Sequence, residues 1–247
     1  MNVVLAHELA RYNQLLAAVR DGLRAVGKAI LGLTVMSLET ERTVEALQAR
    51  RVPAAWAQAA YPSRKALGAW VNDLERRLAF FSAWVKTGAP PRVFWVSGFF
   101  STQSFITGIR QNYARKNGIA IDQLSLHTDV LAARAMSEVG AAPEDGAYVS
   151  GLFLEGCSWD RTGKQLRDAR PKELYAPLPV LWLRPSLEPP PTADVYETPV
   201  YRTTERDGKL STTGHSVNFV LMATLPTDQP AKFWVKRGVA LLCALDE

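Results

Sequence analysis

One stretch of the chain carries the glycines and the lysine of a phosphate-binding loop. Such a loop has the pattern GxxxxGK[ST] between a strand and a helix, so that backbone N–H groups and the lysine surround the phosphates. Here six residues separate Gly156 from Gly163, where the pattern has four. Gln165 follows Lys164 in place of the Ser or Thr that would hold Mg²⁺. We therefore predict a hairpin-like turn with a solvated lysine, and no nucleotide site.

Residue types that bind metals are present but are not clustered. The three histidines, His7, His127 and His215, lie far apart, and neither CxxC nor HxxxH occurs. Metal ligands need a spacing that brings them to one ion. Two cysteines, Cys157 and Cys243, form no disulfide framework and suit a reducing compartment. We expect structural roles for these residues, no metal and no cofactor.

Residues typical of hydrolases are equally isolated. No GxSxG elbow occurs, and His215 follows a hydroxyl-rich segment that favours hydrogen bonds within a turn. The carboxylates of Glu144 and Asp145 stand between a proline and a glycine, which is typical of a turn. Trp159-Asp160 occurs once, whereas a propeller would repeat it. We predict no catalytic residue; an enzyme with an unrecognised site stays an alternative.

Charge is distributed unevenly along the chain. Residues 1–120 hold 16 Lys and Arg against 7 Asp and Glu, a net charge of +9. Residues 121–247 hold 13 against 17, a net charge of −4. The halves could dock on each other or meet different partners.

Basic pairs with nearby aromatic residues raise the possibility of nucleic-acid binding. However, Trp70, Phe81 and Trp84 fall on or beside apolar helix faces, which favours a core position. We interpret the basic residues as a solvated or protein-facing surface. An autonomous basic module for nucleic acid or protein stays the alternative. The pairs are Arg50-Arg51, Arg64-Lys65, Arg76-Arg77 and Arg115-Lys116.

Residues 1–120 are predicted to form a helical bundle. Apolar residues from Leu5 to Ile30 recur at alternating steps of four and three, the spacing of a heptad seam. Leu74, Phe81 and Ile109 of later helices can cover this seam. No apolar run is long enough for a membrane span, so we expect no membrane contact. Further helices are predicted over residues 38–50 with Ser37 as N-cap, 53–56, 67–85, and 101–116 ending at Gly118.

From residue 121 the apolar pattern has a period of two, which predicts strands. In the strand 216–225, Val217, Phe219, Leu221 and Ala223 share one face, so we expect Phe219 to be a core residue. The fold class is therefore α+β, with the helices of residues 1–120 followed by a small antiparallel barrel or sandwich in 121–247. The six predicted strands are 124–130, 147–154, 180–183, 195–203, 216–225 and 239–245.

Several strings, in one consistent order, resemble the C-terminal region of dynein heavy chains of the ciliary type. Any one of them would be weak, but six in family order make chance implausible. Departures are Cys157-Ser158, in place of a small and a basic residue, and Val217, in place of a polar one. The matching strings are VPAxW (52–56), FWVSGFFSTQ (94–103), QNYARK (111–116), GLFLEGxxWD (151–160), STTGHSxNFV (211–220) and RGVALLC (237–243).

This resemblance implies a part that follows the sixth AAA+ module of a microtubule motor. It implies a helical bundle and a partly open, six-stranded β-barrel that lies against the AAA+ ring and tunes force and processivity. The ATP sites and the microtubule-binding stalk would lie upstream, so this segment would not be an enzyme. Glu247 would end the parent chain, and Met1 would be an added start.

The expected partners follow from the same resemblance. They are the AAA+ ring of the same chain, with microtubules and other dynein subunits as partners of the parent and with no nucleic acid. The expected location is the cytoplasm and cytoskeleton, in the axoneme of a cilium or flagellum. A basic outer face is the predicted protein interface, made of Arg76, Arg77, Arg110, Arg115 and Lys116.

Overall fold

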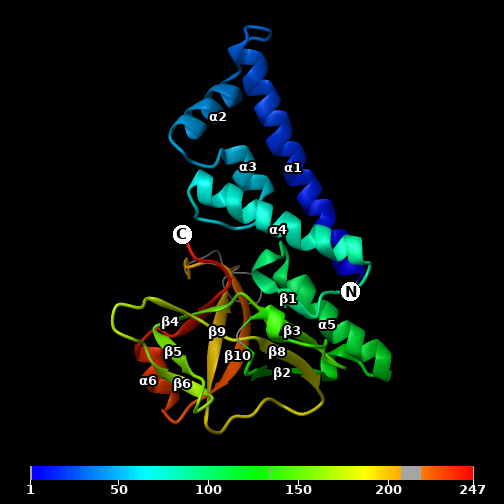
Figure 1. Ribbon diagram of the computed structural model, residues 1–247, viewed down its shortest axis with the longest axis vertical. Coiled ribbons are helices and arrows are strands. Elements are labelled where there is room, and N and C mark those ends of the chain that lie inside the picture. The colour runs from blue at the N-terminus through cyan, green and yellow to red at the C-terminus, as the bar shows by residue number, and fades with distance from the viewer. Residues whose placement is uncertain (1, 134, 207–217, 247) are drawn as a thin grey trace. The chain divides into compact units, whose positions relative to one another are not determined.

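The computed structural model describes residues 2–133, 135–206 and 218–246 (Figure 1). The described residues form helices and mixed sheets, so the predicted α+β class is confirmed. Contacts divide the chain into two compact units. The helical unit holds residues 2–87, 98–100 and 245–246, and the β-rich unit holds residues 88–97 and the described part of 101–244. The predicted division at residue 120, into a helical part and a β part with separate cores, stays a prediction, although α5 groups with the sheets.

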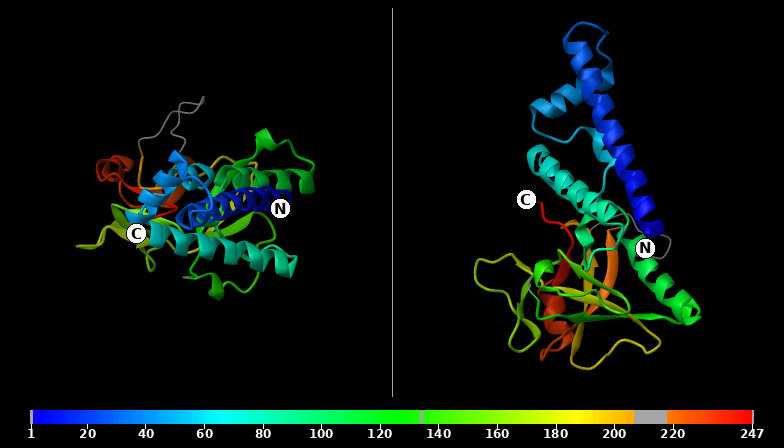
Figure 2. Two further views of the ribbon diagram at one scale, coloured as in Figure 1. Left: turned by 90° about the horizontal axis from the view of Figure 1, so that it is seen from above. Right: turned by 45° about the vertical axis from the view of Figure 1, so that its right-hand side comes forward.

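The helical unit contains α1 (Asn2–Ile30), α2 (Leu38–Gln48), α3 (Ala54–Ala59) and α4 (Leu67–Thr87). Helix α2 folds back along α1, and α3 also packs on α1 (Figures 1 and 2). The N-cap prediction for α2 is confirmed, since the Ser37 hydroxyl accepts a hydrogen bond from the Thr40 backbone N–H at 3.2 Å. No described helix has the length and apolar character needed to cross a membrane.

The buried side of α1 differs from the predicted heptad seam. The buried residues are Val4, Glu8, Tyr12, Leu15 and Val26, whereas Leu16 and Leu23 of the seam are exposed. A straight helix has 3.6 residues per turn, so a strict 3.5-residue seam drifts around its surface unless a partner helix supercoils with it. The prediction of a continuous seam from Leu5 to Ile30 is therefore wrong.

An aromatic cluster forms the core of the helical unit. Tyr12 of α1 contacts the ring of Phe81 on α4 at a centroid distance of 5.2 Å and that of Phe100 at 4.7 Å. Trp70 of α4 stacks against Trp56 of α3 at 6.2 Å. Each of these side chains is buried, so the aromatic residues are core residues, as the apolar helix faces indicate.

The β-rich unit opens with β1 (Val93–Trp95) and α5 (Thr102–Asn117). The left-handed Gly118, with φ +65°, ends α5 as predicted. Besides three 3₁₀ turns, 96–98, 121–123 and 136–138, the remaining elements of the described residues are strands and one short helix. They are β2 (Ser125–Val130), β3 (Ala147–Ser150), β4 (Phe153–Glu155), β5 (Cys157–Asp160), β6 (Gln165–Asp168), β7 (Tyr175–Pro177), β8 (Leu181–Ser186), β9 (Val195–Tyr201), β10 (Phe219–Pro226), α6 (Ala231–Lys236) and β11 (Ala240–Leu242).

Three open sheets are formed by the described strands, where about six antiparallel strands of a barrel were predicted. Their orders are β1-β3-β8-β2, β10-β9-β11-β4-β7 and β5-β6. Two pairs, β1 with β3 and β11 with β9, are parallel. The parallel pair β1–β3 follows from the crossover through α5, which the assumption of antiparallel neighbours ignored. Strands β2 and β10, at the edges of the two larger sheets, nevertheless lie side by side.

The predicted strand 147–154 is in fact two strands in different sheets. Gly151, with φ +88°, turns the chain between β3 and β4. A Cβ atom there would lie 2.4 Å from the Trp95 side chain, so only glycine fits this corner. Strands β5, β6 and β7 were missed because each has only three or four residues, too few to show an alternating apolar pattern.

The core face of β10 is also shifted from the predicted one. The ladder with β9 has an irregularity between Phe219 and Leu221, and these two side chains are only half-buried. Ala223 is buried as predicted, together with Val220 and Leu225. An extra residue in a strand moves alternate side chains to the other face. The prediction of Phe219 as a core residue is therefore wrong.

Candidate protein-interaction surfaces

The predicted basic face begins on α4, where adjacent arginines have opposite environments. Arg76 is exposed, but Arg77 is only 3% exposed. The Arg77 Nε donates to Asp73 Oδ2 at 2.7 Å, and its guanidinium lies 3.6 Å from the centre of the Tyr61 ring. Arg77 is thus a buried residue of the core, and the prediction that it belongs to an exposed interface is wrong.

Electrostatics around Arg77 are consistent with a buried, charged guanidinium. Burial alone would lower the pKa of Arg77, but Tyr12, Asp73 and Tyr61 together raise it. Burial likewise raises the pKa of Tyr12 and of Tyr61 above the ordinary phenol value. A charge in such a place needs its partner, because an unpaired buried charge is costly. Removing either member of the Asp73–Arg77 pair would therefore destabilise the core in which α4 meets Tyr12 and Tyr61.

The segment 98–100 of the FWVSGFF string packs within the helical unit. The Phe100 backbone N–H donates to Glu8 Oε2 at 2.6 Å, and the Tyr12 hydroxyl donates to the Gly98 carbonyl. Glu8 is 1% exposed. Sequence reasoning missed Glu8 because it followed only the apolar residues of α1. Its position four residues before Tyr12, on the same helix face, was the available signal.

The other three predicted basic residues lie on α5, in the β-rich unit. Arg115 and Lys116 are exposed, and Arg110 is half-buried. Lys116 Nζ lies 2.7 Å from Asp145 Oδ1 and 3.8 Å from Glu144 Oε1. The Asp145 hydrogen bond raises the pKa of Lys116. The carboxylates that the sequence placed in a turn thus partner α5, and the structure brings Lys116 to them.

A cluster of exposed apolar side chains lies where α1 ends and α2 begins. A Schellman turn closes α1, because the Leu33 N–H donates to the Lys28 carbonyl and the Gly32 N–H to the Ala29 carbonyl. The following side chains point to solvent; Leu33 is 70% and Val35 96% exposed. We call this set the apolar tip: Ile30, Leu31, Leu33, Val35, Met36 and Leu38.

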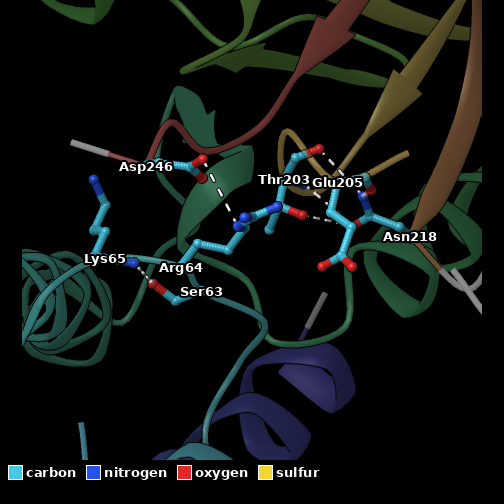
Figure 3. Close-up of polar contacts among 7 residues, drawn as sticks. All are labelled: Ser63, Arg64, Lys65, Thr203, Glu205, Asn218 and Asp246. Atoms are coloured by element: carbon cyan, nitrogen blue, oxygen red, sulfur yellow. Dashed lines mark hydrogen bonds and ion pairs between the residues drawn. The ribbon is translucent and has the colours of Figure 1, made fainter. Parts of the chain in front are cut away.

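Residues near the C-terminus contact the helical unit's segment between α3 and α4. Arg64 Nε lies 3.8 Å from Asp246 Oδ2, and the Lys65 backbone N–H donates to the Ser63 hydroxyl at 3.3 Å (Figure 3). Arg64 and Asp246 are both about half exposed. An exposed pair at this distance contributes little stability, so we regard it as a positioning contact.

Within the β-rich unit, Asn218 joins two segments of the polypeptide. Its side-chain amide donates to the carbonyls of Thr203 and Glu205, and its carbonyl oxygen accepts from the Thr203 N–H at 3.2 Å (Figure 3). Asn218 is 9% exposed. The hydroxyl-rich segment and His215, for which turn hydrogen bonding was predicted, lie outside the described residues.

The stretch that resembled a phosphate-binding loop is a β-hairpin, as predicted. Strands β5 and β6 pair antiparallel from Cys157↔Asp168 to Asp160↔Gln165, and Lys164 lies exposed in the turn between them.

His7 is exposed, whereas His127 bonds the Glu188 carbonyl through Nε2 at 2.9 Å. Over the described ranges, no group of three potential metal ligands comes together.

Comparison with known proteins decides the family. Residues 1–243 match the family model for the C-terminal domain of dynein heavy chains. The chain belongs to this family. This dynein C-terminal domain is 50% identical, over all 247 residues, to dynein axonemal heavy chain 3 of Mus musculus and of Homo sapiens. It is 48% identical to dynein axonemal heavy chain 1 of Mus musculus. The chain spans 6% of the length of each of these relatives.

In these relatives, the dynein C-terminal domain is one part of a much longer polypeptide. The relatives hold many times more sequence than the segment they share with this domain. The exposed surfaces of interest are the apolar tip and Arg76 of α4 in the helical unit, and Arg115 and Lys116 of α5 and the β5–β6 hairpin in the β-rich unit. The apolar tip is the least compatible with water.

Proposed function

We propose that this segment is a contact module of an axonemal dynein heavy chain, an ATP-driven microtubule motor. It packs on the AAA+ ring of the same heavy chain and tunes force and processivity, with no catalysis of its own. Its place in the cell is the cytoskeleton of a cilium or flagellum, in the axoneme. The relatives' names and the resemblance of the motifs support this context.

The observation that carries the proposal is the apolar tip. Six large apolar side chains within nine residues are exposed, although the rest of the helical unit buries its aromatic residues well. Contiguous apolar surface of this kind marks a protein contact. Because the relatives extend far beyond the shared segment, another part of the heavy chain is the simplest cover.

The exposed cations supply the weaker half of the contact. Exposed Arg76 on α4 and Arg115 on α5 would face acidic surfaces of the ring. Half-buried Arg110, and Lys116, which already pairs with Asp145, would add to these two cations. Each exposed ion pair contributes only about 0–1 kcal/mol. Coupling of about 1–3 kcal/mol is enough to shift a conformational equilibrium. The module would thus shift the equilibrium between conformations of the motor without holding the motor in one of them.

The test uses a full-length heavy chain with Leu31, Leu33 and Val35 replaced by serine. We expect altered force or run length in single-molecule motility, while basal ATP turnover survives. Serine at Leu174 and Leu187, exposed apolar residues of the β-rich unit, is the matched control and should leave motility unchanged.

Truncation of the same heavy chain gives a second test. Deleting residues from Ile119 onward should change force or run length and spare basal turnover. A deletion that abolishes ATP turnover in a folded ring, or that leaves every motile parameter unchanged, would contradict the proposed function.

A further inference from the structure

The most basic part of the second half of the chain is a short segment that begins in the β5–β6 turn. Residues 161–172 hold five of the 13 Lys and Arg found in residues 121–247, but only one of the 17 Asp and Glu. This segment, named here the basic hairpin, therefore has a net charge of +4 within a half whose net charge is −4. Its cations, all exposed, are Arg161, Lys164, Arg167, Arg170 and Lys172.

Two arginines of the basic hairpin take no part in the ion pairs of this region. Arg167 lies 3.8 Å from Asp160, and Asp168 lies 3.0 Å from Arg237. The nearby acids of β5 and β6 are thereby matched. Arg161 and Arg170 form no side-chain ion pair or hydrogen bond with any residue in the described ranges.

Both of these arginines border the same two hollows. One has a volume of about 330 Å³ and is lined by Trp159, Arg161, Arg170, Glu173, Ala176 and Pro177. The other, of about 510 Å³, shares Trp159 and both arginines and continues along Arg167 and Pro171. Half-buried Trp159 thus lies in an open depression, together with Arg161 from the β5–β6 turn and Arg170 from the segment that follows β6.

We propose that this depression binds an extended acidic peptide segment of a partner protein. Guanidinium groups recognise carboxylates through paired, planar hydrogen bonds. Trp159, Ala176 and Pro177 give apolar surface for a side chain between the acidic residues. A peptide that alternates carboxylates with apolar groups matches this lining.

Two features favour a peptide over a nucleic acid. Glu173 lines the smaller hollow, and Asp160 and Asp168 line the larger one, so a phosphate at every unit would meet acids as well as arginines. Sequence-independent phosphate binding instead relies on a track of cations with few acids. In a peptide, by contrast, the carboxylates can lie opposite Arg161 and Arg170 alone, with uncharged residues opposite the acids of the depression.

The experiment measures fluorescence anisotropy of a labelled peptide of alternating glutamate and leucine on the 247-residue chain. We expect saturable binding that weakens as salt rises, because the contacts are exposed charges. A peptide with glutamine in place of glutamate should not bind. Replacing both Arg161 and Arg170 by glutamine should weaken binding about five- to tenfold, as two exposed ion pairs allow. Glu173→Gln should tighten it.

Control variants distinguish this site from general attraction to a basic protein. Lys232→Gln with Lys236→Gln removes two exposed charges from α6 and should leave binding unchanged. Circular dichroism confirms that each variant is folded. Equal loss in both double variants would overturn the proposal. So would tighter binding of single-stranded oligothymidylate than of the peptide. Since no other heavy-chain segment is needed, failure here does not affect the proposed packing on the ring.

Discussion

The Thr128 hydroxyl links the two larger sheets through one residue. It donates to the Thr224 carbonyl at 2.9 Å and accepts from the Thr224 N–H at 2.8 Å. Thr128 lies on edge strand β2 and Thr224 on edge strand β10, and both are buried. A side chain thus satisfies the backbone groups that a neighbouring strand would otherwise pair. This link joins β2 to β10 through a side chain, without a backbone ladder between the two strands.

Replacing Thr128 by valine should destabilise the protein by about 1–3 kcal/mol, because it leaves the buried backbone groups of Thr224 without a partner. Valine has nearly the same shape, so the loss reports the hydroxyl. Urea denaturation followed by tryptophan fluorescence measures the free energy of unfolding. Thr128→Ser keeps the hydroxyl and should cost less than the valine change; the reverse order would contradict the link.

Removing the Arg77 guanidinium should lower the free energy of unfolding far more than removing the Arg76 guanidinium. Arg77→Met leaves Asp73 buried without its partner, which costs about 3–5 kcal/mol. Arg76→Met should cost less than about 1 kcal/mol, since exposed ion pairs are weak. Thermal and urea unfolding of both variants gives the comparison. Similar losses would mean that Arg77 is not an interior ion-pair residue.

Replacing side chains of β10 by alanine should lower stability on the buried side of the strand and leave it nearly unchanged on the exposed side. Leu225 is fully buried, so Leu225→Ala should cost about 2–5 kcal/mol of stability. Met222 is 45% exposed, and Met222→Ala should change stability by less than about 0.5 kcal/mol. Chemical denaturation of both variants tests the face assignment, and a larger loss at Met222 would show that the strand register is wrong.

The Cys157 thiol should resist alkylation in the folded protein. Burial, and to a lesser extent Asp168, raises the pKa of Cys157 from 9.0 to about 12. The reactive thiolate is therefore scarce at moderately alkaline pH. Iodoacetamide labelling of a Cys243→Ser variant, which leaves Cys157 alone, should be slow when folded and fast in denaturant. Fast labelling of the native variant would contradict the burial of this thiol.

The same pKa shift has a consequence for stability. The unfolded thiol loses its proton near pH 9, whereas the folded thiol keeps it up to about pH 12. Above pH 9 the unfolded state therefore binds fewer protons, and stability falls as pH rises. Cys157→Ala should reduce this fall between pH 9 and 12, measured by urea denaturation. An unchanged slope would show that Cys157 does not contribute.

Several local features were predictable because they depend on nearby residues alone. The N-cap at Ser37, the stop at Gly118 and the turn at Lys164 are each confirmed. Each depends on hydrogen bonds or backbone angles within a few residues. Of the candidate interface, Arg115 and Lys116 lie exposed at the end of α5 as expected, and their role in binding stays a prediction.

The sequence by itself determined the α+β class, a helix-rich first part before a strand-rich second part, and the family, through short strings whose residues need no partner to be recognised. Only the tertiary structure decided which side of each element is buried. It placed Arg77 inside and Phe219 at the edge of the core, and it divided the strand at Gly151. The physical reason is that burial depends on contacts between residues far apart in the sequence, such as Glu8 with Phe100 and Thr128 with Thr224. Periodicity along one segment does not contain that information.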